Sequence, residues 1–149
     1  MKMFHKPFEI LLVEDNKGDV GLIEEFFYDA EIRTNIHIAN DGEEAISFLC
    51  GKDQFLGSPL PDIIILDWNL PKKDGSEVLK KIKENNNLKN VPVIILTTSS
   101  AKEDIFQAYD LQANAYLVKP IDLDECMKVI KSIEDFWFKT VTLPPKHLH

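Results

Sequence analysis

Cysteine is scarce in this sequence, and long apolar runs are missing from it. The 149 residues include only two cysteines, Cys50 and Cys126, which lie far apart and outside any metal-ligand spacing, so we expect both to be small packing residues in a reducing compartment. The longest apolar stretches have the length of a strand, and the start of the chain, residues 1–7, is short and polar. Neither a membrane span nor an export signal is expected, and a cytoplasmic location is predicted.

Basic residues are outnumbered by acidic ones. Seventeen Lys and Arg residues stand against 25 Asp and Glu residues, which gives a formal net charge of −8. Binding to a nucleic-acid backbone requires clustered Lys and Arg, so direct contact with nucleic acid is not expected. The four histidines, His5, His37, His147 and His149, have no metal-ligand partner at helical spacing and are predicted to be solvated surface residues.

Apolar runs of strand length alternate along the chain with segments of helical period. The clearest strand is residues 62–67, because an apolar run without alternation is typical of a strand that is covered on both faces. A loop marked by glycine and proline precedes this strand. Strands are expected at 9–13, 35–39, 62–67, 91–96 and 115–118, and helices at 20–30, 43–50, 76–84, 101–111 and from the N-cap at 122 to about 138.

Five successive β-then-α units predict one α/β domain. Its fold is expected to be a doubly wound, five-stranded parallel sheet with helices on both faces, in three layers. This domain would span residues 9–138, with an N-terminal arm at 1–8 and a C-terminal tail at 139–149 that extends the last helix. In the fourth helix, the stripe that includes Ala108 and Tyr109 is expected to pack inward.

Polar side chains stand at the carboxyl ends of the predicted strands. Glu14 and Asp15 follow the first strand, Asp67 ends the third, Thr97 follows the fourth and Lys119 follows the fifth. In an open parallel sheet these ends share one edge, where ligands bind. Each residue alone could instead be a turn, a solvated side chain or a helix cap. Their joint position on one edge favours a functional site.

The chemistry of this set points to phosphoryl transfer. Three crowded carboxylates repel one another, and a hard cation such as Mg²⁺, which prefers oxygen ligands, removes that conflict. The ammonium of Lys119 would add a point charge for an anionic ligand. Such an assembly suits transfer of a phosphoryl group to a carboxylate, because cation and lysine neutralise the phosphoryl oxygens.

Five segments of the chain carry a specific resemblance to the receiver domain of two-component response regulators. They are LVEDN at 12–16, DIIILDWNLP at 62–71, DG at 74–75, VIILTT at 93–98 and YLVKP at 116–120. The resemblance covers residues from about Glu9 to Phe138. It implies the flavodoxin-like (βα)5 fold and a phosphoacceptor signalling domain, which catalyses at most its own phosphorylation and dephosphorylation.

The resemblance also implies a role for each matching residue. Asp67 would accept the phosphoryl group from a sensor histidine kinase. The cation, Mg²⁺ or Mn²⁺, would be held by Asp67, by Asp15, by Glu14 through water and by the backbone carbonyl of Asn69. Trp68, beside the acceptor, could shield the phosphoryl group or contact the kinase, but packing is the favoured interpretation.

The remaining matches concern the response to phosphorylation. Lys119 would pair with a phosphoryl oxygen, and its bond to Pro120 would be cis. The Thr97 hydroxyl would move to the phosphoryl group, and Tyr116 would rotate with it, which would change the surface of the fourth helix, fifth strand and fifth helix. Gly75 would supply a backbone that can adopt a positive φ.

The end of the chain has a narrower resemblance. Residues 133–144 resemble the end of single-domain regulators that partner phytochrome-type sensor kinases. This resemblance implies a homodimer through the surface of the fourth helix, fifth strand and fifth helix, together with the tail. Independently, Phe136, Trp137 and Phe138 are consecutive, so one helical stripe cannot bury all three, and at least one should be exposed as a partner surface. Alternatively, one ring folds back under the following proline tail.

Other functions are less well supported. A receiver-like module could bind or dimerise without phosphorylation, but such modules typically lose the acceptor, an acid or the lysine. A phosphatase with an aspartyl intermediate would need a second aspartate at the position of Asn69. A nucleotide or flavin site would need a glycine-rich loop after the first strand, where residues 14–19 are acidic instead.

Overall fold

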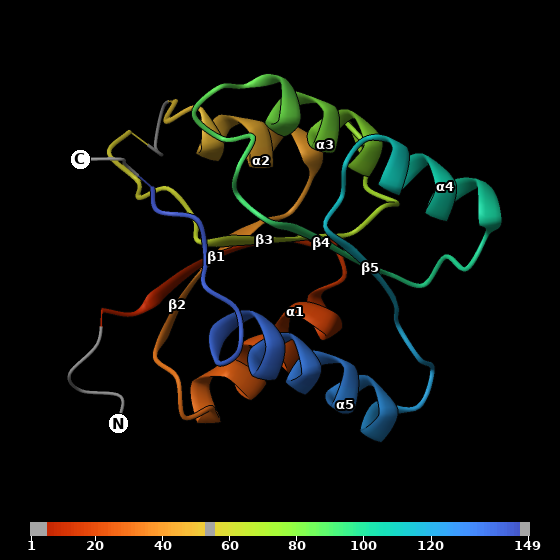
Figure 1. Ribbon diagram of the computed structural model, residues 1–149. Coiled ribbons are helices and arrows are strands. Elements are labelled where there is room, and N and C mark those ends of the chain that lie inside the picture. Colours follow the sequence, from red (N-terminus) through yellow and green to blue (C-terminus); the bar gives the residue numbers. More distant parts are fainter. Residues whose placement is uncertain (1–5, 53–55, 147–149) are drawn as a thin grey trace.

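Five parallel strands form a single sheet with helices on both faces (Figure 1). The computed structural model describes residues 6–52 and 56–146. The strand order is β2-β1-β3-β4-β5, so the doubly wound fold predicted from the sequence is confirmed. The strands are β1 (Phe8–Val13), β2 (Thr34–Ala39), β3 (Ile63–Leu66), β4 (Val93–Thr97) and β5 (Ala115–Val118). The helices are α1 (Lys17–Asp29), α2 (Gly42–Leu49), α3 (Gly75–Glu84), α4 (Lys102–Asp110), α5 (Leu123–Ile133) and a π-helical turn, η2 (Glu134–Phe138).

Four of the helices begin at a side-chain cap. Asn16, Asp41, Asp74 and Asp122 each accept a hydrogen bond from the backbone N–H three residues further on, which satisfies a donor that the first turn leaves free. The cap at Asn16 starts α1 three residues earlier than the apolar stripe predicts. That difference places the first turn of α1 beside the end of β1.

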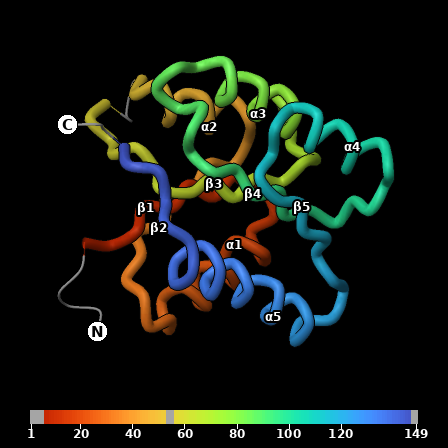
Figure 2. Tube along the Cα trace, in the orientation of Figure 1, coloured from red at the N-terminus to blue at the C-terminus, as the bar shows by residue number. Residues whose placement is uncertain are grey.

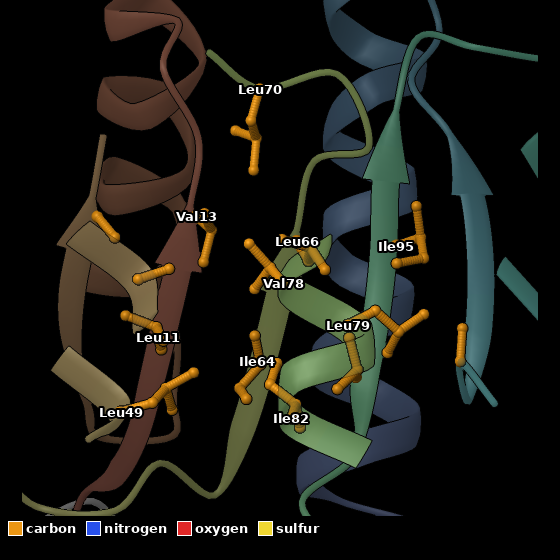
Figure 3. Packing of buried hydrophobic residues seen from close by; sticks show 14 of the residues in the cluster. Leu11, Val13, Leu49, Ile64, Leu66, Leu70, Val78, Leu79, Ile82 and Ile95 are labelled. Atoms are coloured by element: carbon orange, nitrogen blue, oxygen red, sulfur yellow. The ribbon is translucent and has the colours of Figure 1, made fainter. Parts of the chain in front are cut away.

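The sheet divides the core into two layers. Helices α2, α3 and α4 cover one face, and α1 and α5 cover the other (Figure 1). Along β3, Ile64 and Leu66 face the first layer, whereas Ile63 and Ile65 face the second. Figure 3 shows Ile64 and Leu66 packed against Val78 of α3. Burial on both faces explains the continuous apolar run.

Helix α4 packs less deeply than its stripe predicts. Ala108 is buried, but Tyr109 exposes 50% of its surface, so the prediction that Tyr109 packs inward is wrong. The Tyr109 hydroxyl instead accepts a hydrogen bond from the backbone N–H of Tyr116, at 3.1 Å, along the open edge of β5. The neighbouring Phe106 is also exposed. The outer face of α4 is therefore partly apolar.

The last predicted helix changes its winding before it ends. Phe138 is buried in η2, with ring centroids 4.5 Å from Phe8 and 6.0 Å from Phe27, and Trp137 is half-buried. Phe136 exposes 51% of its surface, so the expectation that one of the three rings is exposed is confirmed.

The tail then returns across the amino-terminal edge of the sheet, where Lys146 Nζ lies 3.5 Å from Asp62 Oδ1 (Figure 2). No helix within the described residues has the length and apolar character needed to cross a bilayer.

Two expectations about single residues need correction. Cys126 is buried as predicted, but Cys50 is exposed, and both thiols are free. His37 is half-buried and has partners: its Nε2 lies 2.8 Å from Glu9 Oε1, and its ring centroid lies 5.1 Å from that of Phe48. The other three histidines lie outside the described residues.

Candidate functional site

The polar strand ends converge at the carboxyl edge of the sheet. Glu14 and Asp15 follow β1, and Asp67 follows the neighbouring strand β3. One carboxylate oxygen from each of the three lies within 4.8 Å of the others. Glu14 and Asp67 are buried, and Asp15 is exposed. The strand order reverses between β1 and β3, which is the place where open α/β sheets bind ligands.

This carboxylate cluster fits a hard divalent cation. Burial raises the pKa of the Glu14 carboxyl to about 7; the hydrogen bond from Lys119 opposes this effect and the charge of Asp67 adds to it. A cation bound among the three acids would stabilise the Glu14 carboxylate against both its burial and the charge of Asp67. Mg²⁺ and Mn²⁺ suit oxygen donors of this kind, and the exposed Asp15 leaves room for bound water.

The buried ammonium of Lys119 joins this cluster from β5. Its Nζ donates hydrogen bonds to Glu14 Oε1 and, at 2.9 Å, to Asp19 Oδ2, and it lies 3.9 Å from Asp67 Oδ2. Burial lowers the pKa of Lys119, but the hydrogen bonds to Glu14 and Asp19 and the nearby acidic charges outweigh burial and raise it. Lys119 is therefore a fixed positive charge beside Asp67.

Asp19 is a member of the site that the sequence reasoning missed. It lies in the first turn of α1, whereas the sequence alone indicates only an acidic segment at 14–19. The signal that could have identified it is Asn16, a favourable N-cap residue three positions earlier. A helix that starts at Lys17 turns residue 19 back toward the end of β1.

The loop after β3 is held by close backbone packing. Asn69 N–H donates to Asp67 Oδ1 at 3.3 Å, and Gly75 N–H donates to the Trp68 carbonyl at 2.9 Å. A Cβ at Gly75 would lie 2.7 Å from the Asp67 carbonyl oxygen and from Trp68 Cα. The expectation of a positive φ at Gly75 is wrong: the position needs glycine because of this close approach, and the positive φ belongs to Lys72.

Trp68 points away from the edge. Its side chain is buried in the core layer beneath α2 and α3, so the favoured interpretation, that it packs, is confirmed. The indole therefore anchors the backbone next to Asp67, while Asp67 itself faces the carboxylate cluster.

Thr97 and Tyr116 are linked through one residue. Thr97 is fully buried, and its Oγ1 accepts a hydrogen bond from Ser99 N–H at 3.5 Å. Tyr116 Oη donates to the Ser99 carbonyl at 2.9 Å. Helix α4 begins at Lys102 after Ala101, so Thr97 does not cap that helix. Ser99 therefore connects Thr97 and Tyr116 through two hydrogen bonds.

One implied feature is not present. All peptide bonds among the described residues are trans, so the expectation of a cis bond between Lys119 and Pro120 is wrong. The backbone at this point is still firmly placed, because Lys119 N–H donates to the Thr97 carbonyl at 2.7 Å.

Comparison with known proteins identifies response regulators as relatives. Residues 10–131 match the model of the response regulator receiver domain. The response regulator Rcp1 of Synechocystis is 46% identical over 138 residues, which are 93% of this chain and 94% of Rcp1. The crystal structure of the phosphorylated cyanobacterial phytochrome response regulator RcpA has a TM-score of 0.91 at 42% identity and covers 94% of this chain and all of that one. The Mn²⁺-bound form of Rcp1 has a TM-score of 0.90 at 45% identity, covering 93% of this chain and all of that one.

Proposed function

Because this chain belongs to the response regulator receiver family, we propose that it accepts a phosphoryl group on Asp67 and changes its binding surface in response. The single observation that supports this most strongly is the position of Asp67. A carboxylate oxygen of Asp67 belongs to the carboxylate cluster, and Asp67 Oδ2 lies 3.9 Å from the ammonium of Lys119. A nucleophile between a cation site and a lysine is what transfer to a carboxylate requires.

In the proposed reaction, an Asp67 carboxylate oxygen bonds to the phosphorus of the donor while the bond from phosphorus to the donor's leaving group breaks. Mg²⁺ held by Glu14, Asp15 and Asp67, with the Asn69 carbonyl, would neutralise charge on the phosphoryl oxygens. Lys119 would pair with one of these oxygens. The Thr97 hydroxyl would move from Ser99 N–H to another.

The response would be a shift between two arrangements of the β4–α4 region. A new hydrogen bond from the Thr97 hydroxyl to the phosphoryl group would favour one arrangement, because this hydrogen bond is available only after phosphorylation. The hydrogen bond from Tyr116 Oη to the Ser99 carbonyl would then break or move, since Ser99 follows Thr97 closely. This would change the surface of α4, β5 and α5.

The phosphodonor of a receiver domain is a sensor histidine kinase, and we propose a phytochrome-type kinase in this case. The support is the similarity to Rcp1 and to phytochrome response regulators of known structure. A cytoplasmic location would agree with the two free cysteines. The acidic composition supports a protein target rather than nucleic acid.

We also propose a homodimer through α4, β5, α5 and the tail. The support is a set of exposed apolar side chains on these elements. The exposed Phe136 and the half-buried Trp137, which follow α5, would extend this surface, and the buried Phe138 packs its ring against that of Phe8. The set consists of Phe106, Tyr109, Val118, Ile121, Leu123 and Phe136.

The test is the intact mass after incubation with acetyl phosphate and Mg²⁺, for the wild type and for Asp67→Asn. A gain of one phosphoryl group in the wild type alone supports the proposal. No gain in folded wild-type protein would favour the alternative, a receiver-like module that binds or dimerises without phosphorylation. The matched control is Asp41→Asn, which changes the same type of side chain at the cap of α2.

A further inference from the structure

The hydrogen bonds of Lys119 do not point toward the acceptor. The ammonium side chain is 6% exposed, and it donates to Glu14 and to Asp19, the latter at 2.9 Å. The Asp67 oxygen, at 3.9 Å, is beyond hydrogen-bond distance. Two of the three N–H donors of Lys119 are therefore engaged by Glu14 and Asp19, and both acids compete with a phosphoryl oxygen on Asp67 for this ammonium.

Asn16 sets the positions of both acidic partners. Its backbone N–H donates to Glu14 Oε2 at 3.1 Å, and its side-chain oxygen accepts from Asp19 N–H at 3.0 Å. Asp19 also stands in the first turn of α1, where the helix dipole favours a carboxylate. Its carboxylate is consequently held toward Lys119 by the helix start and does not depend on a flexible loop.

The two acids differ in their relation to the cation. Glu14 belongs to the carboxylate cluster, so a bound cation would compete with Lys119 for it. Asp19 is not part of that cluster, and its carboxylate, 35% exposed, bonds Lys119 from the α1 side. Asp19 is thus the partner that would still hold Lys119 once the cation has bound.

We propose that Asp19 is a positioning residue that holds Lys119 away from Asp67 and so lowers the affinity of the site for a phosphoryl group. This inference rests on the proposed phosphorylation of Asp67. Two anions, the Asp19 carboxylate and the phosphoryl oxygen, would compete for the Lys119 ammonium. Without the Asp19 charge, Lys119 turns to the phosphoryl group at lower cost.

The test is the affinity for beryllofluoride, a phosphoryl analogue, at saturating Mg²⁺, measured by ¹⁹F NMR. Asp19→Asn should bind it about tenfold more tightly than the wild type, since a hydrogen bond to a charged group can change an equilibrium by such a factor. Asp29→Asn, at the other end of α1, removes the same charge far from the cap and should match the wild type. The helix cap uses the backbone of residue 19, so Asp19→Asn keeps it.

A double-mutant cycle with Lys119→Gln separates positioning from charge repulsion. If Asp19 acts through Lys119, Asp19→Asn has no effect on beryllofluoride affinity in the Lys119→Gln background. Equal tightening in both backgrounds, or unchanged or weaker binding in the single variant, overturns the inference.

Two further results separate this inference from the proposed function. The ¹⁵N signal of the Lys119 ammonium in cation-free protein should move in Asp19→Asn and stay in Asp29→Asn. If the wild type takes neither beryllofluoride nor a phosphoryl group, the proposed function itself fails, and the inference fails with it. If the wild type takes both while Asp19→Asn behaves identically, only the inference fails.

Discussion

Gly75 lies where the first turn of α3 meets the backbone that carries the acceptor. A methyl group at this position would be 2.7 Å from the Asp67 carbonyl oxygen and from Trp68 Cα, and 2.9 Å from the Trp68 carbonyl oxygen. All three are backbone atoms and cannot rotate away. Gly75→Ala should therefore displace either α3 or the loop after β3.

The expected magnitude comes from two opposing effects. An alanine in a helix is favoured over glycine by about 1 kcal/mol, whereas forcing a methyl group into filled space costs about 1–3 kcal/mol. Since the three nearest atoms are all backbone, the cost lies in the upper part of that range, and we expect a net loss of about 1–2 kcal/mol in the free energy of unfolding. The rate of phosphorylation by acetyl phosphate should fall as well, because Asp67 moves with the loop.

Gly21 provides a matched control in the same protein. It lies inside α1, and a Cβ there would meet no atom within 4 Å. Gly21→Ala should raise the free energy of unfolding by about 1 kcal/mol through helix propensity alone. Urea denaturation of both variants measures the two effects. If Gly75→Ala were as stable as Gly21→Ala, the explanation by close approach would be refuted.

Three further predictions concern charge and association. Burial raises the pKa of Glu14 to about 7, so without a divalent cation the free energy of unfolding should fall as the pH rises through 7 and the buried carboxyl loses its proton. A proton on Glu14 also competes with the cation, so the Mg²⁺ affinity measured by calorimetry should rise about tenfold between about pH 6 and pH 8. A flat pH profile would contradict this. Lys119→Met should leave the Glu14 carboxylate without its cationic partner and lower the free energy of unfolding, measured by urea denaturation at about pH 8, by about 3 kcal/mol. Mg²⁺ should restore part of this loss. An equal loss with and without Mg²⁺ would contradict a cation site that includes Glu14. Phe136→Ser should weaken the dimer in sedimentation experiments without loss of stability, whereas Tyr28→Ser, exposed on α1, should not; a dimer unaffected by Phe136→Ser would exclude this surface.

Much of the fold can be predicted from the sequence, because the burial of each strand or helix determines the pattern of its apolar residues. The run at 62–67 identifies a strand covered on both faces, and the structure places β3 in the middle of the sheet. The position of the site follows equally, since parallel strands bring their carboxyl ends to one edge. Glu14, Asp15 and Asp67 are within reach of one another for that reason.

What the sequence could not supply depends on contacts between elements. Tyr109 fits an inward stripe on α4, yet its hydroxyl bonds the open edge of β5, which only the packing of α4 determines. The use of Gly75 for close approach instead of positive φ depends on where the loop after β3 passes. The apolar stripe does not identify Asp19, because the start of α1 is set by the cap at Asn16. The change to a π-helical turn at η2 has no periodic signal of its own.

The phosphoryl group should be carried by Asp67, and a chemical label on the phosphorylated residue shows its position directly. Wild-type protein incubated with acetyl phosphate and Mg²⁺ would be reduced with borohydride, which converts an aspartyl phosphate to homoserine, and its peptides would be sequenced by mass spectrometry. Homoserine at position 67 alone is the predicted result. Homoserine at position 15 or 19, or none at any position in folded protein, would contradict phosphorylation of Asp67.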